Sequence, residues 1–157
     1  MKIYDAIKRD HDHHRQLLDA LAGTSGDSDE RRAAWSTFFY DVKAHAAAEE
    51  ECFYARLMAT THGQPDARHS VHEHQSLDEV LDDLNDMDMS SPGWLLRFKT
   101  LREQYQHHID EEEEELFASA REQIGADADG RIGHAFRSRK AQEVNLVDRK
   151  MEEAVED

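Results

Sequence analysis

HAAAEEECFY at residues 45–54 is matched in outline by HIDEEEEELF at residues 108–117. Each segment has a His, two Glu residues four and five positions later, an apolar residue at its ninth position and an aromatic residue at its tenth. Residues four apart lie on the same face of an α-helix, one turn above each other. The shared pattern therefore predicts two helices that each present an imidazole and a carboxylate to a common interior.

The rest of the chain also has a helical period. Turn residues gather at 23–26, 60–65, 87–92 and 125–130, and between these breaks apolar residues recur every three or four positions. Four amphipathic segments with short loops predict an all-α, up-down-up-down four-helix bundle over residues 1–124. Residues 125–157 are expected to form a C-terminal helical extension, which docks on the bundle or on another subunit, as in a homodimer.

Particular residues mark the expected ends and faces of these helices. Asp27 with Glu30 predicts a capping box, and Ser91 predicts an N-cap directly before Pro92. The apolar stripe of the C-terminal helix is expected to comprise Ile132, Phe136, Val144, Val147, Met151 and Val155.

Length and charge limit the classes of function. The chain has 157 residues, which predicts one main domain, and its 35 acidic and 19 basic residues give a net charge of −16. Such a surface repels phosphate backbones and anionic lipid, so neither nucleic acid nor membrane is expected as a partner. The chain has one Cys and shows no apolar stretch typical of a signal peptide near Met1, which predicts a cytoplasmic protein.

Polar residues interrupt the apolar stripe of every predicted bundle helix. These residues are His11, His45, His74 and His108, and a Glu lies one turn after two of them, at Glu49 and Glu112. Counted from the helix ends, the four His lie within about 6 Å of one level along the bundle. Burial of imidazoles and carboxylates is costly unless each has a partner, and bound cations would satisfy both. The pattern predicts a metal site in the core.

Other readings compete at several positions. The His-x-x-x-Glu spacing also occurs at His69/Glu73 and His107/Glu111, so the spacing alone is a weak signal, and the ten-residue frame is more specific. His14 is the main rival to His11. The remaining acidic residues of the two segments, including Glu50, Glu51, Glu113 and Glu114, read as a solvated face. Tyr105 is a candidate hydrogen-bond donor to a metal-bound ligand or a packing residue, and Tyr54 is a weaker candidate of the same kind.

The sequence at this point resembles the hemerythrin-like family, the HHE cation-binding domain, over residues 3 to about 120. The resemblance rests on Asp10-His11, His45/Glu49, Glu73-His74 and His108/Glu112 on four successive helices. It implies two iron ions bridged by carboxylates and an oxo or hydroxo group. It also implies the metal ligands: His11, His45, His74 and His108 as terminal ligands, and Glu49 and Glu112 as bridges.

The chain departs from the oxygen-carrying members of that family. Those proteins resemble one another in a His pair one turn apart on the third helix and a fifth His ligand, whereas Ser70 and Asp78 flank His74 here. Asp78 is a candidate extra ligand. The resemblance therefore implies a non-haem di-iron protein whose iron pair binds oxygen, nitric oxide or peroxide, in sensing, storage or detoxification. The alternative is an enzyme that turns over peroxide or nitric oxide at the same irons.

Overall fold

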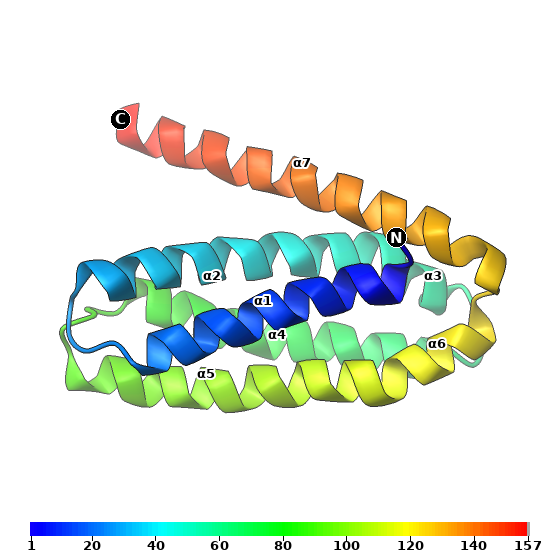
Figure 1. Cartoon of the computed structure of the whole chain (residues 1–157), viewed down its shortest axis with the longest axis horizontal. Helices are drawn as coiled ribbons and strands as arrows, with labels where there is room; N and C mark the ends of the chain where they lie inside the picture. The colour runs from blue at the N-terminus through cyan, green and yellow to red at the C-terminus, as the bar shows by residue number, and fades with distance from the viewer. Residues whose placement is uncertain (157) are drawn as a thin grey trace.

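A computed structural model describes the backbone of residues 1–156 and the side chains of residues 1–146. The four bundle helices are α1 (Ile3–Ala22), α2 (Asp29–Glu49), α4 (Gln64–Asp86) and α5 (Pro92–Glu111), which alternate in direction as predicted (Figure 1). The other elements are η1 (Glu50–Tyr54), α3 (Ala55–Met58), η2 (Glu112–Leu116), α6 (Phe117–Gln123), η3 (Ala126–Ala128) and the tail helix α7 (Asp129–Glu156). No strand occurs in residues 1–156. The predicted all-α bundle with a tail helix is confirmed.

The predicted N-cap at Ser91 lies where expected. Ser91 caps α5 by accepting a hydrogen bond from the backbone N–H of Gly93, and proline occupies the first turn of α4 and of α5. The capping box at Asp27 and Glu30 is wrong by one residue. Ser28 is the N-cap of α2, and its hydroxyl accepts from the N–H of Arg31 at 3.2 Å.

The apolar core is divided into two parts by a polar layer. One part lies at the N-terminal end of α1 and contains Ile7, Phe53 and Leu116. The other part lies toward the opposite end of the bundle and contains Leu18, Trp35 and Trp94. The buried histidines of α1, α2 and α4 fall in sequence between these two sets, and His108 of α5 lies next to Ile109, the last α5 residue of the second set. The helices thus hold imidazoles and carboxylates at a single level, surrounded by apolar side chains.

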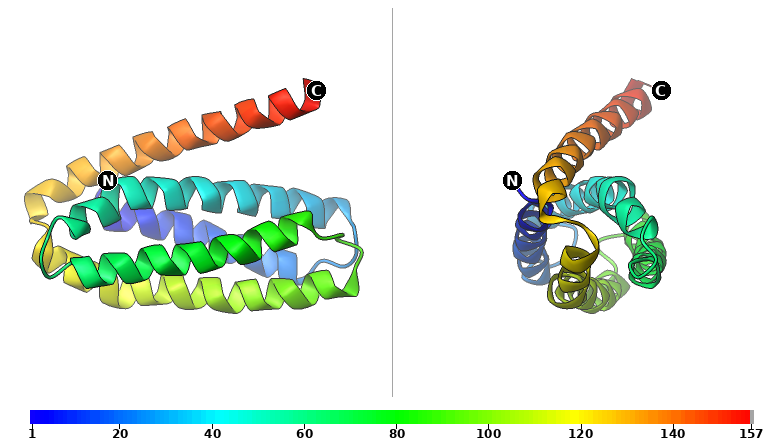
Figure 2. Two further views of the ribbon diagram at one scale, coloured as in Figure 1. Left: turned by 180° about the vertical axis from the view of Figure 1, so that it is seen from behind. Right: turned by 90° about the vertical axis from the view of Figure 1, so that its right-hand side faces the viewer.

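The tail helix α7 packs on the outside of α1 and α2 (Figure 2). Gly133 allows the close approach, because a Cβ atom there would collide with the backbone of Met1 and Ile3. Phe136 is 1% exposed, and its ring lies 5.4 Å from the ring of His45. The predicted stripe residues Val147, Met151 and Val155 lie outside the described side chains. Within residues 1–156, no helix combines the length and the apolar character needed to cross a bilayer.

Candidate metal centre

All six predicted ligands lie together in the polar layer, and each is at most 6% exposed. Their donor atoms form two groups, in which all atoms lie within 4.8 Å of one another. The first group is His11, His45 and Glu49, and the second is Glu49, His74, His108 and Glu112. Because Glu49 belongs to both groups, its carboxylate occupies the position that a bridging ligand requires.

The Nε2 atoms of three imidazoles meet the carboxylates at the centre of the layer. His74 Nε2 lies 3.0 Å from Glu49 Oε1 and 3.1 Å from His108 Nε2. His45 Nε2 lies 3.3 Å from Glu49 Oε2, and His108 Nε2 lies 3.3 Å from Glu112 Oε2. This arrangement gathers atoms that repel one another, such as two imidazole nitrogens at hydrogen-bond distance, unless a proton or a cation lies between them.

Outward-facing Nδ1 atoms of all four histidines contact carboxylates. The pairs are His11–Glu113 (2.8 Å), His45–Asp10 (2.7 Å), His74–Glu50 (3.2 Å) and His108–Glu73 (3.0 Å). A carboxylate only accepts, so each Nδ1–H donates and the Nε2 lone pair of the neutral ring is left for a metal. Such outer carboxylates orient the histidines of metal sites.

These contacts have an internal twofold pattern that the sequence analysis missed. Asp10 and Glu73 each precede a predicted ligand His, and Glu50 and Glu113 each follow a predicted ligand Glu. The reading of Glu113 as part of a solvated face is therefore wrong, because its side chain is 17% exposed. Glu50 is a surface residue as expected, with a side chain that is 42% exposed, but its contact with His74 was not predicted. Glu51 and Glu114 are exposed as expected. The signal was present as an acidic residue next to the ligand at all four places.

Unpartnered atoms test whether the site fits a cation. Among the side chains of residues 1–146, the buried polar atoms without a hydrogen-bond partner are Tyr4 Oη, His11 Nε2, Glu49 Oε2 and Glu112 Oε1. Three of these four belong to the predicted ligands. A buried polar atom without a hydrogen-bond partner costs about 1–3 kcal/mol. Three such atoms are therefore expected at one level only where a bound ion supplies the missing partner. The residues fit a metal centre.

Without a bound metal, the side chains of the polar layer differ widely in how readily they hold protons. Burial lowers the pKa of His45 and His74, but the charge of Glu49 and the hydrogen bonds to carboxylates outweigh it and raise both to about 9. Burial lowers the pKa of His11 to about 4. Burial and the charge of Glu49 hold the pKa of Glu112 well above its usual range. His45 and His74 thus carry protons at neutral pH, and a bound metal must displace them.

Tyr54 is the central polar residue that sequence reasoning ranked too low. Its hydroxyl lies 2.7 Å from Glu49 Oε1, 2.8 Å from Glu112 Oε2 and 3.3 Å from His74 Nε2. Burial, followed by the charges of the two carboxylates, raises the pKa of Tyr54 well above its usual range. The phenol is therefore neutral, and its one proton can be donated to either carboxylate.

A wide helical turn brings Tyr54 to this place. Part of each repeated ten-residue segment, η1 in the first and η2 in the second, forms a π-helical turn rather than an α-helical one. Such a turn contains an extra residue and is frequent at functional sites. The repeated sequence frame is thus a repeated structure, but only the first copy carries a hydroxyl, because the matching aromatic residue of the second copy is Phe117.

His14 and Tyr105 form a separate hydrogen-bonded group beside the centre. Asp41 accepts from His14 Nε2 at 2.5 Å, and His14 Nδ1 accepts from the Tyr105 hydroxyl at 2.6 Å. His14 lies outside both ligand groups. Asp78 also lies outside them and pairs instead with Lys43 at 3.2 Å, so the structure does not support it as an extra ligand.

Asp10→Asn is expected to lower metal affinity about 10–100-fold while leaving the fold intact, because His45 loses its charged orienting partner. Asp12→Asn is the matched control, since Asp12 is exposed on the same helix and pairs only with Lys8 and Arg15 in the described structure. Metal competition with a chelator of known affinity measures both variants. Equal affinity in the two would contradict an orienting role for Asp10.

Comparison with known proteins adds family and fold. The hemerythrin HHE cation binding domain family matches residues 2–120. A crystal structure of a hemerythrin HHE cation binding domain-containing protein from Mycobacterium kansasii is similar in fold, with a TM-score of 0.86 and 21% sequence identity. The similarity covers 97% of this chain and 93% of that one.

A curated relative from Nostoc sp. carries the name DNA nickase. It is 26% identical over 141 residues, which amount to 90% of this chain and 40% of the relative. The chain thus spans less than half of the relative's length.

Proposed function

The chain belongs to the hemerythrin HHE cation-binding domain family, and from this premise we propose that its two buried ligand groups hold a pair of iron ions. His11 and His45 would bind one iron, His74 and His108 the other, and Glu49 and Glu112 would bridge them together with an oxo or hydroxo group. The observation that carries the proposal is the set of unpartnered buried atoms at His11 Nε2, Glu49 Oε2 and Glu112 Oε1.

The donor set supports iron over other common metals. Four imidazoles and two carboxylates at one place suit iron or manganese, whereas structural zinc takes four ligands and often thiolates, and calcium takes oxygen ligands. Cys52 does not belong to either ligand group. The four outer carboxylates balance the positive charge that two divalent or trivalent ions bring into a buried layer.

The surroundings of the centre favour a small ligand. Iron supplies exchangeable coordination positions and a change of oxidation state to a ligand such as oxygen, nitric oxide or peroxide. A narrow cavity beside His45, His74 and His108 has room for one molecule of about the size of water. Its wall includes Val42, Leu77 and Leu81, whose apolar side chains favour a small ligand. Tyr54 holds a proton within reach of both carboxylates. We propose binding of such a ligand in sensing, storage or detoxification.

Oxidised protein is expected to show charge-transfer bands in the near ultraviolet that change when azide or peroxide is added. The expected response follows from the open coordination positions and the cavity beside the ligand histidines. Titration under an absorption spectrometer, with peroxide assayed in parallel, measures it. Sustained loss of peroxide that His108→Ala stops would establish an enzyme, and reversible spectral change would establish a binding protein. No spectral response to azide or to peroxide would contradict ligand binding.

We do not propose that this chain nicks DNA. The name DNA nickase belongs to a relative, and the match covers only 40% of that relative's length. A net charge of −16 disfavours contact with phosphate backbones.

A further inference from the structure

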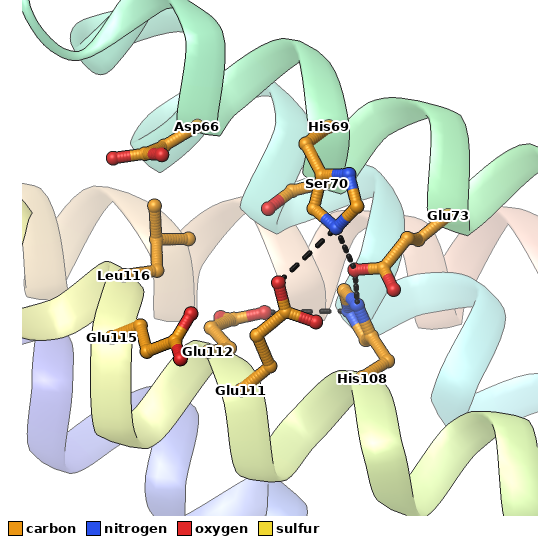
Figure 3. A pocket seen from close by; sticks show the side chains of 9 residues that line it. All are labelled: Asp66, His69, Ser70, Glu73, His108, Glu111, Glu112, Glu115 and Leu116. Carbon is orange, nitrogen blue, oxygen red and sulfur yellow. Dashed lines mark hydrogen bonds and ion pairs between the residues drawn. The ribbon is translucent and has the colours of Figure 1, made fainter.

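A pocket opens at the surface between α4 and the junction of α5 with η2 (Figure 3). Its rim carries the acidic side chains of Asp66, Glu73, Glu111 and Glu115, together with the imidazole of His69. Four carboxylates around one opening, in a chain of net charge −16, attract cations and repel anions.

Three rim residues have the spacing of metal ligands. Donor atoms of His69, Glu73 and Glu111 all lie within 4.8 Å of one another. His69 Nε2 is 3.4 Å from Glu73 Oε1 and 3.2 Å from Glu111 Oε1. His69 is 54% exposed, whereas the two carboxylates are 20% and 27% exposed, so the group is accessible from water. These residues come from the two His-x-x-x-Glu pairs that lie outside the ten-residue frame.

The inner end of the pocket reaches the buried centre. Glu112 lines the same pocket, is only 2% exposed, and has an unpartnered Oε1 atom. Glu73 Oε1, which faces His69, also accepts from His108 Nδ1 at 3.0 Å. The exposed group and the buried ligands are therefore joined by one shared carboxylate and by one pocket wall (Figure 3).

We propose that His69, Glu73 and Glu111 form an entry site that captures a divalent metal ion from solution and passes it to Glu112 and His108. This inference rests on the proposed function, because it supposes a buried centre to be filled. One imidazole and two carboxylates that are partly open to water give weak, reversible binding, which suits a site of transit. The carboxylates also replace part of the ion's hydration shell before it enters the bundle.

Glu111→Gln is expected to slow metal uptake by the metal-free chain about tenfold or more without changing the final metal content. Glu111 suits the test because it contacts His69 and His107 but none of the six ligands. Glu114→Gln is the matched control, with the same loss of charge at an exposed position of the adjoining turn. Stopped-flow absorption with Co²⁺ gives the rate, and elemental analysis gives the content.

A second measurement isolates the entry site itself. Protein whose centre is already filled with iron is expected to bind one further Mn²⁺ ion weakly, and His69→Ala is expected to abolish that binding in an electron paramagnetic resonance titration. If Glu111→Gln and Glu114→Gln take up metal at equal rates and both reach the normal final metal content, the entry site is overturned. Mn²⁺ binding that survives His69→Ala would also overturn it. A wild-type chain that takes up no metal at all would overturn the proposed function and the entry role with it.

Discussion

Glu49→Ala is expected to abolish binding of both metal ions, the largest loss that any single substitution in the centre should cause. Glu49 is the one residue shared by the two ligand groups, so its removal deprives both sites of an oxygen ligand. In the metal-free chain, His45 and His74 also lose the charge that raises the pKa of each to about 9. Removal of one partner from a buried ion pair costs about 3–5 kcal/mol of unfolding free energy.

Elemental analysis and urea denaturation of the metal-free chain test this expectation. Glu114→Ala is the control, because Glu114 lies in the second of the two repeated acidic segments but is exposed and belongs to neither ligand group. It should retain the metal and the stability of the wild type. A Glu49→Ala variant with two tightly bound ions would refute the bridging position assigned to this carboxylate.

The second large effect separates two neighbouring histidines. His11→Ala is expected to lose one of the two metal ions, because its Nε2 atom is directed into the first ligand group and has no partner there. His14→Ala is expected to keep both ions yet to lower the free energy of unfolding by about 2–4 kcal/mol, since it leaves a cavity and removes one buried and one part-buried hydrogen bond.

Metal content and denaturation of both variants, measured side by side, decide between the two roles. The two side chains have equal size and both are fully buried, so each serves as the control for the other. Loss of metal from the His14 variant alone would reverse the assignment on α1.

The fold and the burial of the six predicted ligand residues at one level could be predicted because they leave a direct trace in the sequence. A His in an apolar stripe, as at His45 three residues after Val42, breaks a pattern that burial otherwise enforces. Two such breaks one turn apart, with the same ten-residue frame on another helix, are improbable in a helix that only packs. The sequence favours His11 over His14 only through the family resemblance, since both lie near the stripe.

The acidic neighbours of the predicted ligands are visible in the sequence, but the contacts that they and Tyr54 make depend on helix geometry that the sequence does not reveal. On an α-helix, Tyr54 lies about 140° around the axis from Glu49, away from the carboxylate. The π-helical turn η1 changes that angle and brings the phenol within 2.7 Å of Glu49. Glu50 and Glu113 read as solvated for a related reason, because their partners His74 and His11 come from other helices.

Iron content of the aerobically purified chain, produced with ample iron, tests the account most directly. Two ligand groups joined by Glu49 predict about two iron ions per chain, with the charge-transfer bands of a bridged ferric pair. Elemental analysis on a sample of known protein concentration, together with its absorption spectrum, gives both quantities. One zinc ion per chain and no iron under those conditions would contradict the di-iron centre.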